Sequence, residues 1–298
     1  MANLTVEAGD FCPATQTYSD TLRVQTFIEF YRLLGYDAVA LGAKEIAFGF
    51  GTWKDAVKHG VPVLAANVFK RGNVLTYPQP DEALLDASRT SPRGFNGQYY
   101  VRNDHGYRLG VIGFVSRSAW KARKDTLAAL TFKSPFEMQD LVEEVAGNCD
   151  HLTVLGEFTL QEAESLARVM PEINLIVASN IKIDQQQKQG RTVIIGLPPR
   201  GNNGNYLEWN LANRDSVEVL SKTVSLDTGA KEDSTIAGML KVVAVKIAGP
   251  PPVPAKAVAS PAKTPSPVMS KPASVTTPPS PPSPVPPGVP VDPDGARQ

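Results

Sequence analysis

The sequence predicts an α/β protein, because short apolar runs alternate with amphipathic segments that have helical spacing. The first apolar run stops at Gly9, and the first predicted helix stops at Gly35. The predicted order is strand, helix, strand, helix, strand over residues 3–8, 21–34, 37–41, 52–58 and 61–65. Short connections of this kind are typical of a layered sheet with helices on its faces.

Further elements follow a segment, residues 70–103, that is rich in Pro, Gly, Arg and Asp and is predicted to have little regular structure. Order returns at residues 99–101, which begin a hairpin with its turn at Asp104-His105-Gly106, and the hairpin leads into a buried strand, residues 108–115. The remaining predictions are helices at 135–146, 159–169 and 234–243, and strands at 151–155, 175–178, 192–196 and 206–211, of which the last two form a closing pair.

The predicted folded domain covers residues 1–248, and a proline-rich tail covers residues 249–298. Of the 26 prolines in the chain, 17 lie between Pro250 and Pro293. The tail has almost no large apolar side chain, so it cannot bury enough surface to offset its conformational entropy. We therefore predict a disordered, extended spacer, with a PxxP ligand for a protein partner as the alternative.

Composition excludes several classes of function. The chain has 30 basic and 30 acidic residues, so it offers no electrostatic footprint for nucleic acid or an anionic membrane. No apolar run reaches the roughly 18 residues of a membrane helix, and no signal peptide is recognisable at Met1. Cys12 and Cys149 are too few for a disulfide scaffold or a thiolate zinc site, although one pair in an oxidising compartment stays open.

Three motifs near the start of the chain carry a family resemblance. They are Gly9-Asp10, Leu41-Gly42-Ala43-Lys44-Glu45 and Val61-Pro62-Val63-Leu64-Ala65-Ala66-Asn67. They resemble G-D, G-N-H-E-F-D-x-G and P-x-x-x-A-N of the calcineurin-like metallophosphoesterases, 5′-nucleotidase and UDP-sugar hydrolase type. Further matches follow in the same order at residues 110–113, 150–157, 173–182 and 201–211. The resemblance implies a four-layer α/β/β/α sandwich. The family's first strand, which ends in an Asp-x-His motif, has no counterpart in this sequence. We therefore expect that the start of the coding sequence is misplaced at Met1.

The family's chemistry needs two divalent cations held by Asp, Asn and His side chains. Carried over by the resemblance, Asp10 matches the bridging aspartate, whereas Ala43 and Lys44 stand where the family has Asn and His. Glu157, Asn180 and Lys182 stand in place of three family histidines. We expect no cofactor; if the protein is active with a divalent metal (Zn, Mn or Mg), its candidate ligands are Asp10, Glu157 and Asn180.

Lysines are expected to supply the missing positive charge. Lys44 and Lys182 would lie beside Asp10 and Glu157, which predicts a stable, metal-free pocket for a small phosphorylated ligand. Glu45 and Arg200 are the other candidate pocket or anion-binding residues. Arg200 opens a glycine-rich segment that either cradles an anion with its amides or forms a plain turn.

Cys12 and Lys44 are the candidate catalytic residues. Cys12 follows Asp10 on the loop that leaves the first predicted strand, where reactive groups of open α/β sheets collect. Two nearby lysines are expected to lower the pKa of its thiol. The alternative is a small, partly buried cysteine without a chemical function.

The sequence therefore predicts a catalytically degenerate relative of the 5′-nucleotidases that works as a binding or redox-linked module. The resemblance implies a place in the periplasm or cell envelope. The alternative is an active phosphohydrolase, acting on phosphomonoesters or nucleotides, with an altered metal site and Lys44 as its electrophile.

Overall fold

A computed structural model describes residues 4–13, 15–70, 73–74, 98–121, 130–179, 181, 186–197, 203–209, 219–225 and 233–248. The chain divides into two compact units, Met1–Pro251 and Pro252–Gln298, and every described residue belongs to the first. The predicted tail, residues 249–298, lies outside the described residues, so its disorder stays a prediction. Among the described helices, none is long and apolar enough to cross a lipid bilayer.

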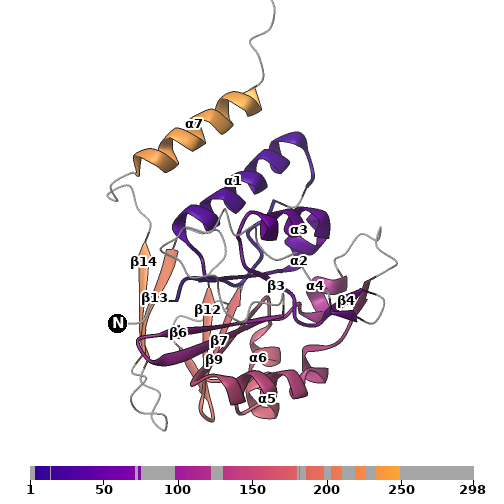
Figure 1. The fold of residues 1–298 in the computed structure, drawn as a ribbon, viewed down its shortest axis with the longest axis vertical. Helices are drawn as coiled ribbons and strands as arrows, with labels where there is room; N and C mark the ends of the chain where they lie inside the picture. Colours follow the sequence, from indigo (N-terminus) through magenta and orange to yellow (C-terminus); the bar gives the residue numbers. More distant parts are fainter. Residues whose placement is uncertain are drawn as a thin grey trace, which may run out of the picture. The chain divides into compact units, whose positions relative to one another are not determined.

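The first unit has a mixed α/β fold (Figure 1). Its helices are α1 (Tyr18–Leu34), α2 (Ala43–Phe48), α3 (Phe50–Lys58), α4 (Arg117–Lys121), α5 (Gln139–Asn148), α6 (Leu160–Val169) and α7 (Ser234–Ala248), with a 3-10 turn, η2, at Pro135–Glu137. Its strands are β1 (Val6–Glu7), β2 (Ala38–Ala40), β3 (Val63–Leu64), β4 (Val68–Lys70), β5 (Asn73–Val74), β6 (Tyr99–Asp104), β7 (Tyr107–Gly113), β8 (Leu130–Phe132), β9 (His151–Gly156), β10 (Leu175–Ser179), β11 (Gln187–Gln189), β12 (Thr192–Leu197), β13 (Asn203–Trp209) and β14 (Val219–Ser225).

The described part of the chain has four sheets: β13-β14, β5-β4-β8 and two others, which position the predicted motifs. Of these two, the smaller one is parallel, with the order β1-β2-β3. The larger one has six strands in the order β11-β12-β10-β9-β7-β6, and its four central strands are parallel. The edge strands β6 and β11 pair antiparallel with their neighbours. The predicted motifs lie at the carboxyl ends of strands. In the smaller sheet these strands are β1 and β2, and in the larger sheet they are β9 and β10.

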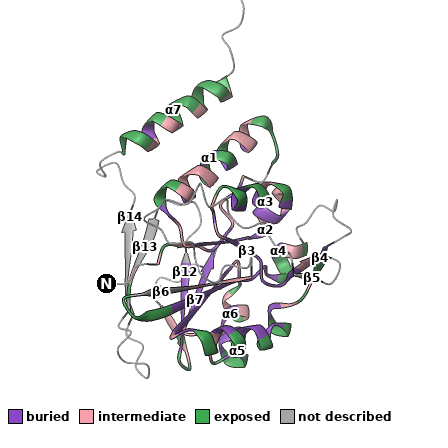
Figure 2. Cartoon of the chain, viewed as in Figure 1, coloured by how far each residue is buried: buried purple, intermediate pink, exposed green. Residues whose placement is uncertain are grey.

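Both faces of the six-stranded sheet are covered, which explains its long apolar runs. Successive side chains of β10 alternate between two cores: Val177 packs in the core shared with the three-stranded sheet, and Ile176 packs in the core beneath α5 and α6. Figure 2 shows the buried strands in purple, with exposed residues gathered on the outer side of α5. Trp53 of α3 belongs to the first core and is 1% exposed.

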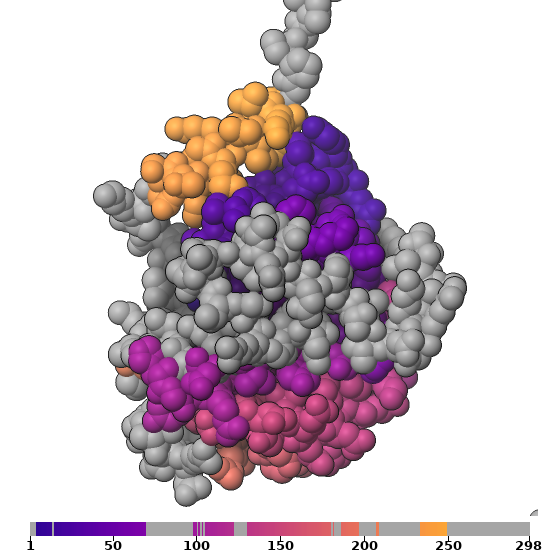
Figure 3. Space-filling view, in the orientation of Figure 1, coloured from indigo at the N-terminus to yellow at the C-terminus, as the bar shows by residue number. Residues whose placement is uncertain are grey.

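Helix α1 begins at a capping box, in which Thr17 and Asp20 bond each other's backbone amides, and it ends at Gly35 in the left-handed conformation. Helix α7 packs against α1, as the adjoining orange and indigo surfaces of Figure 3 show. It leaves apolar side chains exposed at Leu240, Val242 and Val245.

Several predicted elements differ from the structure. The predicted closing pair is wrong, because β12 pairs with β10 and β11, while β13 pairs with β14. Residues 70–103 contain β5 and the end of β4, which the sequence did not predict, whereas residues 75–97 lie outside the described part. The predicted hairpin is confirmed, because β6 pairs antiparallel with β7 across the turn at His105 and Gly106. The sequence did not predict α2 and α4, which are only 6 and 5 residues long.

Candidate functional site

The loops after β1 and β2 meet backbone to backbone at Gly9 and Gly42. Gly9 has a φ of 93°, and a Cβ there would lie 2.6 Å from the Gly42 nitrogen. A Cβ on Gly42 would lie 2.7 Å from the Asp10 nitrogen and 2.8 Å from a carboxylate oxygen of Glu157. Asp10 itself has a φ of 68°, a conformation that non-glycine residues adopt rarely. The Gly-Asp and Leu-Gly-Ala-Lys-Glu motifs are therefore in direct contact.

The carboxylate of Glu45 joins these two loops. It accepts the backbone N–H of Asp10 at 2.6 Å, of Cys12 at 2.7 Å and of Gly42 at 2.8 Å. Glu45 is 0% exposed, and burial raises the pKa of its carboxyl group. The indole N–H of Trp53 donates to the Glu45 carbonyl at 2.8 Å. The expectation that Glu45 is a pocket or anion-binding residue is wrong, because its oxygens face backbone amides inside the protein.

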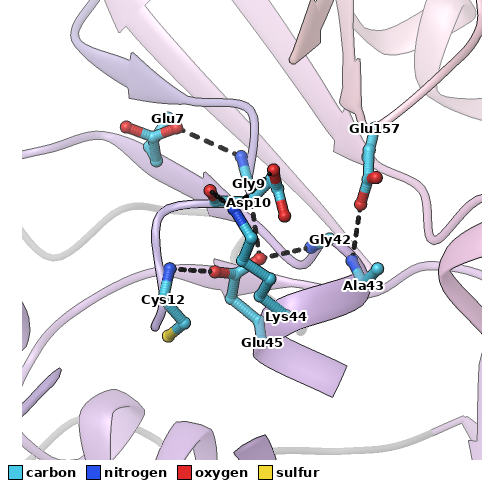
Figure 4. Close-up of polar contacts among 9 residues, drawn as sticks. All are labelled: Glu7, Gly9, Asp10, Cys12, Gly42, Ala43, Lys44, Glu45 and Glu157. Carbon is cyan, nitrogen blue, oxygen red and sulfur yellow. Dashed lines mark hydrogen bonds and ion pairs between the residues drawn. The ribbon is translucent and has the colours of Figure 1, made fainter. Parts of the chain in front are cut away.

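Lys44 and Asp10 form an ion pair at the same edge (Figure 4). The Lys44 Nζ lies 3.0 Å from Asp10 Oδ2 and donates more weakly to the Asp10 carbonyl, at 3.4 Å. The Lys44 side chain is 41% exposed and that of Asp10 is 9% exposed. The prediction that Lys44 brings its ammonium group to Asp10 is therefore confirmed.

Glu157 reaches the edge from the other sheet. It follows β9, and one of its oxygens accepts the backbone N–H of Ala43 at 2.6 Å. Asp10, Ala43, Lys44 and Glu157 thus converge around Gly42, and we call this group the strand-end site. Asn180, Lys182 and Arg200, which the sequence places with it, lie outside the described residues.

Ser179 is a buried polar residue that the sequence analysis did not single out. It ends β10, and the register that pairs Ala178 with Gly156 makes Ser179 the neighbour of Glu157. Ser179 is 5% exposed, and within the described residues its hydroxyl has no hydrogen-bond partner. The signal was its position, directly after a predicted strand and before Asn180.

Cys12 does not have the environment that the sequence analysis expected. Its side chain is 3% exposed, and burial, followed by the nearby Glu45 carboxylate, raises the pKa of the thiol above its ordinary value. The charge of Lys44 acts in the opposite direction but is the smallest of these influences. The expectation of a lowered thiol pKa is therefore wrong, because the loss of water outweighs the lysine. Cys149 is also buried, and both cysteines are free.

Two positions of the strand-end site do not suit the divalent cations that the resemblance implies. Ala43 offers no donor atom from its side chain, and the Asp10 carboxylate already has the Lys44 ammonium at 3.0 Å. A divalent cation on that carboxylate would be repelled by the ammonium at short range. Within the described ranges, no group of three or more His, Cys, Asp or Glu side chains could hold a metal ion.

Glu7, at the end of β1, adds a half-buried carboxyl group. Its Oε1 accepts the Gly9 N–H at 3.2 Å. Burial, with repulsion from Glu45 as the next cause, raises the pKa of Glu7 from 4.5 to about 7. Between these values the folded protein holds a proton that the unfolded chain releases, so stability falls as the pH rises through this window.

We therefore expect Glu7→Gln to be more stable than the parent protein above pH 7, by roughly 1 to 3 kcal/mol. Below pH 4.5 the two proteins should be equally stable, because the Glu7 carboxyl group is then neutral in the folded and in the unfolded protein. Urea unfolding at several pH values measures the difference. Parallel stability curves for the two proteins across this range would contradict the prediction.

Comparison with known proteins gives a consistent picture of the fold. No model of a protein family matches the chain. A snake venom 5′-nucleotidase from Gloydius brevicauda is 29% identical over 156 residues, which are 51% of this chain and 23% of that protein. The chain thus spans less than a quarter of this relative's length.

Solved structures resemble most of the described fold. The sulfate thiohydrolase SoxB of Thermus thermophilus has a TM-score of 0.65 and 15% identity, over 80% of this chain and 42% of that one. A 5′-nucleotidase precursor from Thermus thermophilus has a TM-score of 0.63 and 21% identity, over 82% of this chain and 50% of that one. The chain spans about half the length of these proteins or less. It therefore has the fold of these solved proteins, a 5′-nucleotidase precursor among them, as its motifs predict.

Proposed function

We propose that this protein binds a small phosphorylated ligand at the strand-end site and does so without the two-metal chemistry of the family that its motifs resemble. The observation that carries the proposal is the ion pair between Lys44 and Asp10. A lysine ammonium has three donor hydrogens and binds phosphate as a point charge. Two of the three N–H donors of Lys44 Nζ bind Asp10, one its carboxylate and one its carbonyl. Because the Lys44 side chain is 41% exposed, the third N–H can donate to a phosphate oxygen.

The other groups at this edge support binding rather than metal coordination. Ser179 ends β10, the neighbour of the strand that Glu157 follows, and its buried hydroxyl has no hydrogen-bond partner within the described residues. The substitution of Ala43 and Lys44 for the family's Asn and His leaves the site degenerate as a metal centre. Lys182 and Arg200 would add positive charge if they face the same edge. A location in the periplasm or cell envelope, where the resemblance puts it, is part of this proposal.

A redox or nucleophilic function of Cys12 is not part of the proposal. The thiolate is the reactive form of cysteine, and the raised pKa of Cys12 keeps the thiol protonated at neutral pH. The sulfur is also buried in the core beneath the loop.

A second candidate is a phosphohydrolase with a single metal held by Asp10, Glu157 and Asn180. It is favoured by one observation, the convergence of Asp10 and Glu157 on Gly42 from two different sheets. In that case Lys44 would stabilise the charge that develops on the phosphoryl group.

Two measurements on the full chain separate these candidates. We expect Lys44→Gln to weaken the binding of inorganic phosphate and of a phosphomonoester by about tenfold or more in calorimetry. Lys58→Gln is the matched control. Lys58 also pairs with an aspartate, Asp55 at 3.2 Å, but both residues are on α3 and neither belongs to the strand-end site. After dialysis against Zn²⁺ or Mn²⁺, we expect much less than one ion per chain.

The outcome that would reverse the proposal is equally specific. Hydrolysis of 4-nitrophenyl phosphate that needs a divalent metal and is lost in Asp10→Ala would establish the phosphohydrolase. Equal phosphate binding by Lys44→Gln and Lys58→Gln would show that the strand-end site is not the anion site.

A further inference from the structure

A cavity lies between α4, the end of β8 and η2, outside the strand-end site. It has a volume of about 330 Å³ and is lined by Arg117, Trp120, Lys121, Phe132, Ser134 and Glu137. A smaller hollow of about 100 Å³ adjoins it and shares Arg117 and Ser134. The larger volume is in the range in which proteins hold small organic ligands. We call the larger one the α4 cavity.

The aromatic wall of the α4 cavity is a stacked pair. The rings of Trp120 and Phe132 are nearly parallel, with an interplanar angle of 15° and centroids 5.2 Å apart. Trp120 is on α4 and Phe132 is on β8, the next element along the described chain, so the two rings stack on each other at the wall of the cavity. A planar ring can extend such a stack, and offset stacking of this kind is favourable by about 0.5 to 1.5 kcal/mol.

The wall is held in place by buried hydrogen bonds. The Asn67 side chain donates to the Val115 and Lys133 carbonyls, both at 2.8 Å, and accepts the Val115 N–H at 2.9 Å. It therefore ties the start of α4 to the end of β8. The Ser116 hydroxyl then accepts the Ala119 N–H at 3.0 Å and caps α4. The cavity is preformed, which lowers the entropic cost of binding.

The charges around the cavity are unbalanced. Arg117 and Lys121 are exposed, lie four residues apart on α4 and so repel each other. Within the described part of the chain neither has an ion pair or hydrogen bond. The one acid among the residues that line the α4 cavity is Glu137, whose carboxylate accepts the Ser134 N–H at 2.6 Å, so two cations face a single carboxylate. An anion between the two cations would relieve their repulsion.

We propose that the α4 cavity binds a small aromatic anion, that is, a planar ring that carries a phosphate, sulfate or carboxylate group. The anionic group lies between Arg117 and Lys121, and the ring packs on the Trp120 and Phe132 pair. Ser134 offers a hydroxyl beside the anion. This site is separate from the strand-end site and depends neither on Lys44 nor on a metal.

Calorimetry on the full chain tests the proposal with phenyl phosphate, phenyl sulfate and benzoate as probes. At least one of them is expected to bind about tenfold more tightly than both benzyl alcohol, which has only the ring, and inorganic phosphate, which has only the charge. The double variant Arg117→Ala/Lys121→Ala should lose this binding, whereas the control Lys54→Ala/Lys246→Ala, which removes the same charge elsewhere, should keep it. These measurements are made in the Lys44→Gln background, because the strand-end site is itself proposed to bind inorganic phosphate and phosphomonoesters. Binding that remains in this background and is lost in the double variant belongs to the α4 cavity.

Tryptophan fluorescence gives a second readout. Binding should change the emission of the parent protein, and Trp120→Phe, which keeps an aromatic ring in the wall, should abolish that change while retaining most of the affinity. The proposal is overturned if the aromatic anions do not bind at millimolar concentration or bind the double variant as tightly as the parent. It is also overturned if, in the Lys44→Gln background, inorganic phosphate binds as tightly as phenyl phosphate.

Discussion

Replacing Glu45 by Ala is expected to lower the free energy of unfolding by about 3 to 5 kcal/mol, because three backbone N–H groups lose their acceptor. These are the amides of Asp10, Cys12 and Gly42, all within 2.8 Å of a Glu45 oxygen. Since Glu45 is 0% exposed, water can replace the lost acceptor only by entering the cavity that the substitution creates. Urea unfolding followed by circular dichroism measures the loss.

Glu45→Gln should fall between the parent and Glu45→Ala, because the amide keeps one acceptor oxygen and turns an NH₂ group toward a backbone donor. Glu137→Gln is a suitable comparison, since Glu137 also accepts a backbone N–H, that of Ser134, but is exposed. We expect it to cost about 1 kcal/mol or less. A Glu45→Ala protein as stable as Glu137→Gln would show that the three bonds contribute little.

Gly42→Ala is the second substitution with a large expected effect, a loss of about 3 kcal/mol. The new Cβ would lie 2.7 Å from the Asp10 nitrogen, 2.8 Å from Glu157 Oε2 and 2.9 Å from Glu45 Oε2. The first of these atoms is backbone and cannot swing aside, so the loop that carries Asp10 must move. The expected result is a lower urea midpoint, together with weaker phosphate binding than in the parent.

Gly51→Ala is the matched control for this experiment. Gly51 is in α3, and a Cβ there would meet no atom within 4 Å. Alanine favours helix over glycine, so this variant should be more stable by about 0.5 kcal/mol. If Gly42→Ala were as stable as Gly51→Ala, the close approach of the two loops would not constrain residue 42.

The sequence predicted the elements that lie within one continuous pattern. Helix α1 is an example, because its helical spacing and its Gly35 stop both lie within the segment itself, although the helix begins at Tyr18, three residues before the predicted start. Helix α2 was missed because its 6 residues are too few to show a period, and its first turn had been assigned to a motif. The partner of β13 was also mispredicted, since pairing depends on a distant strand, β14, and not on local residues.

At the site, the sequence predicted which residues come together but not what surrounds them. The pairing of Lys44 with Asp10 followed from the order of the motifs. The pKa of Cys12 did not, because it depends on how much water the folded chain removes from the sulfur. Glu45 was misassigned for the same reason, since a carboxylate that serves a pocket and one that binds backbone amides are identical in the sequence.

The Glu45 carboxylate holds the loops of the strand-end site together without being one of the proposed metal ligands. In a metal centre, the ions themselves can hold the surrounding loops together. Here a side chain outside the proposed ligand set joins the loops of Asp10 and Gly42. The residues at positions 43 and 44 can then be substituted while the backbone of the two loops stays in place. Architecture and reactivity at this edge are therefore separable, and new activities could be introduced on it by substitution of a few exposed residues alone.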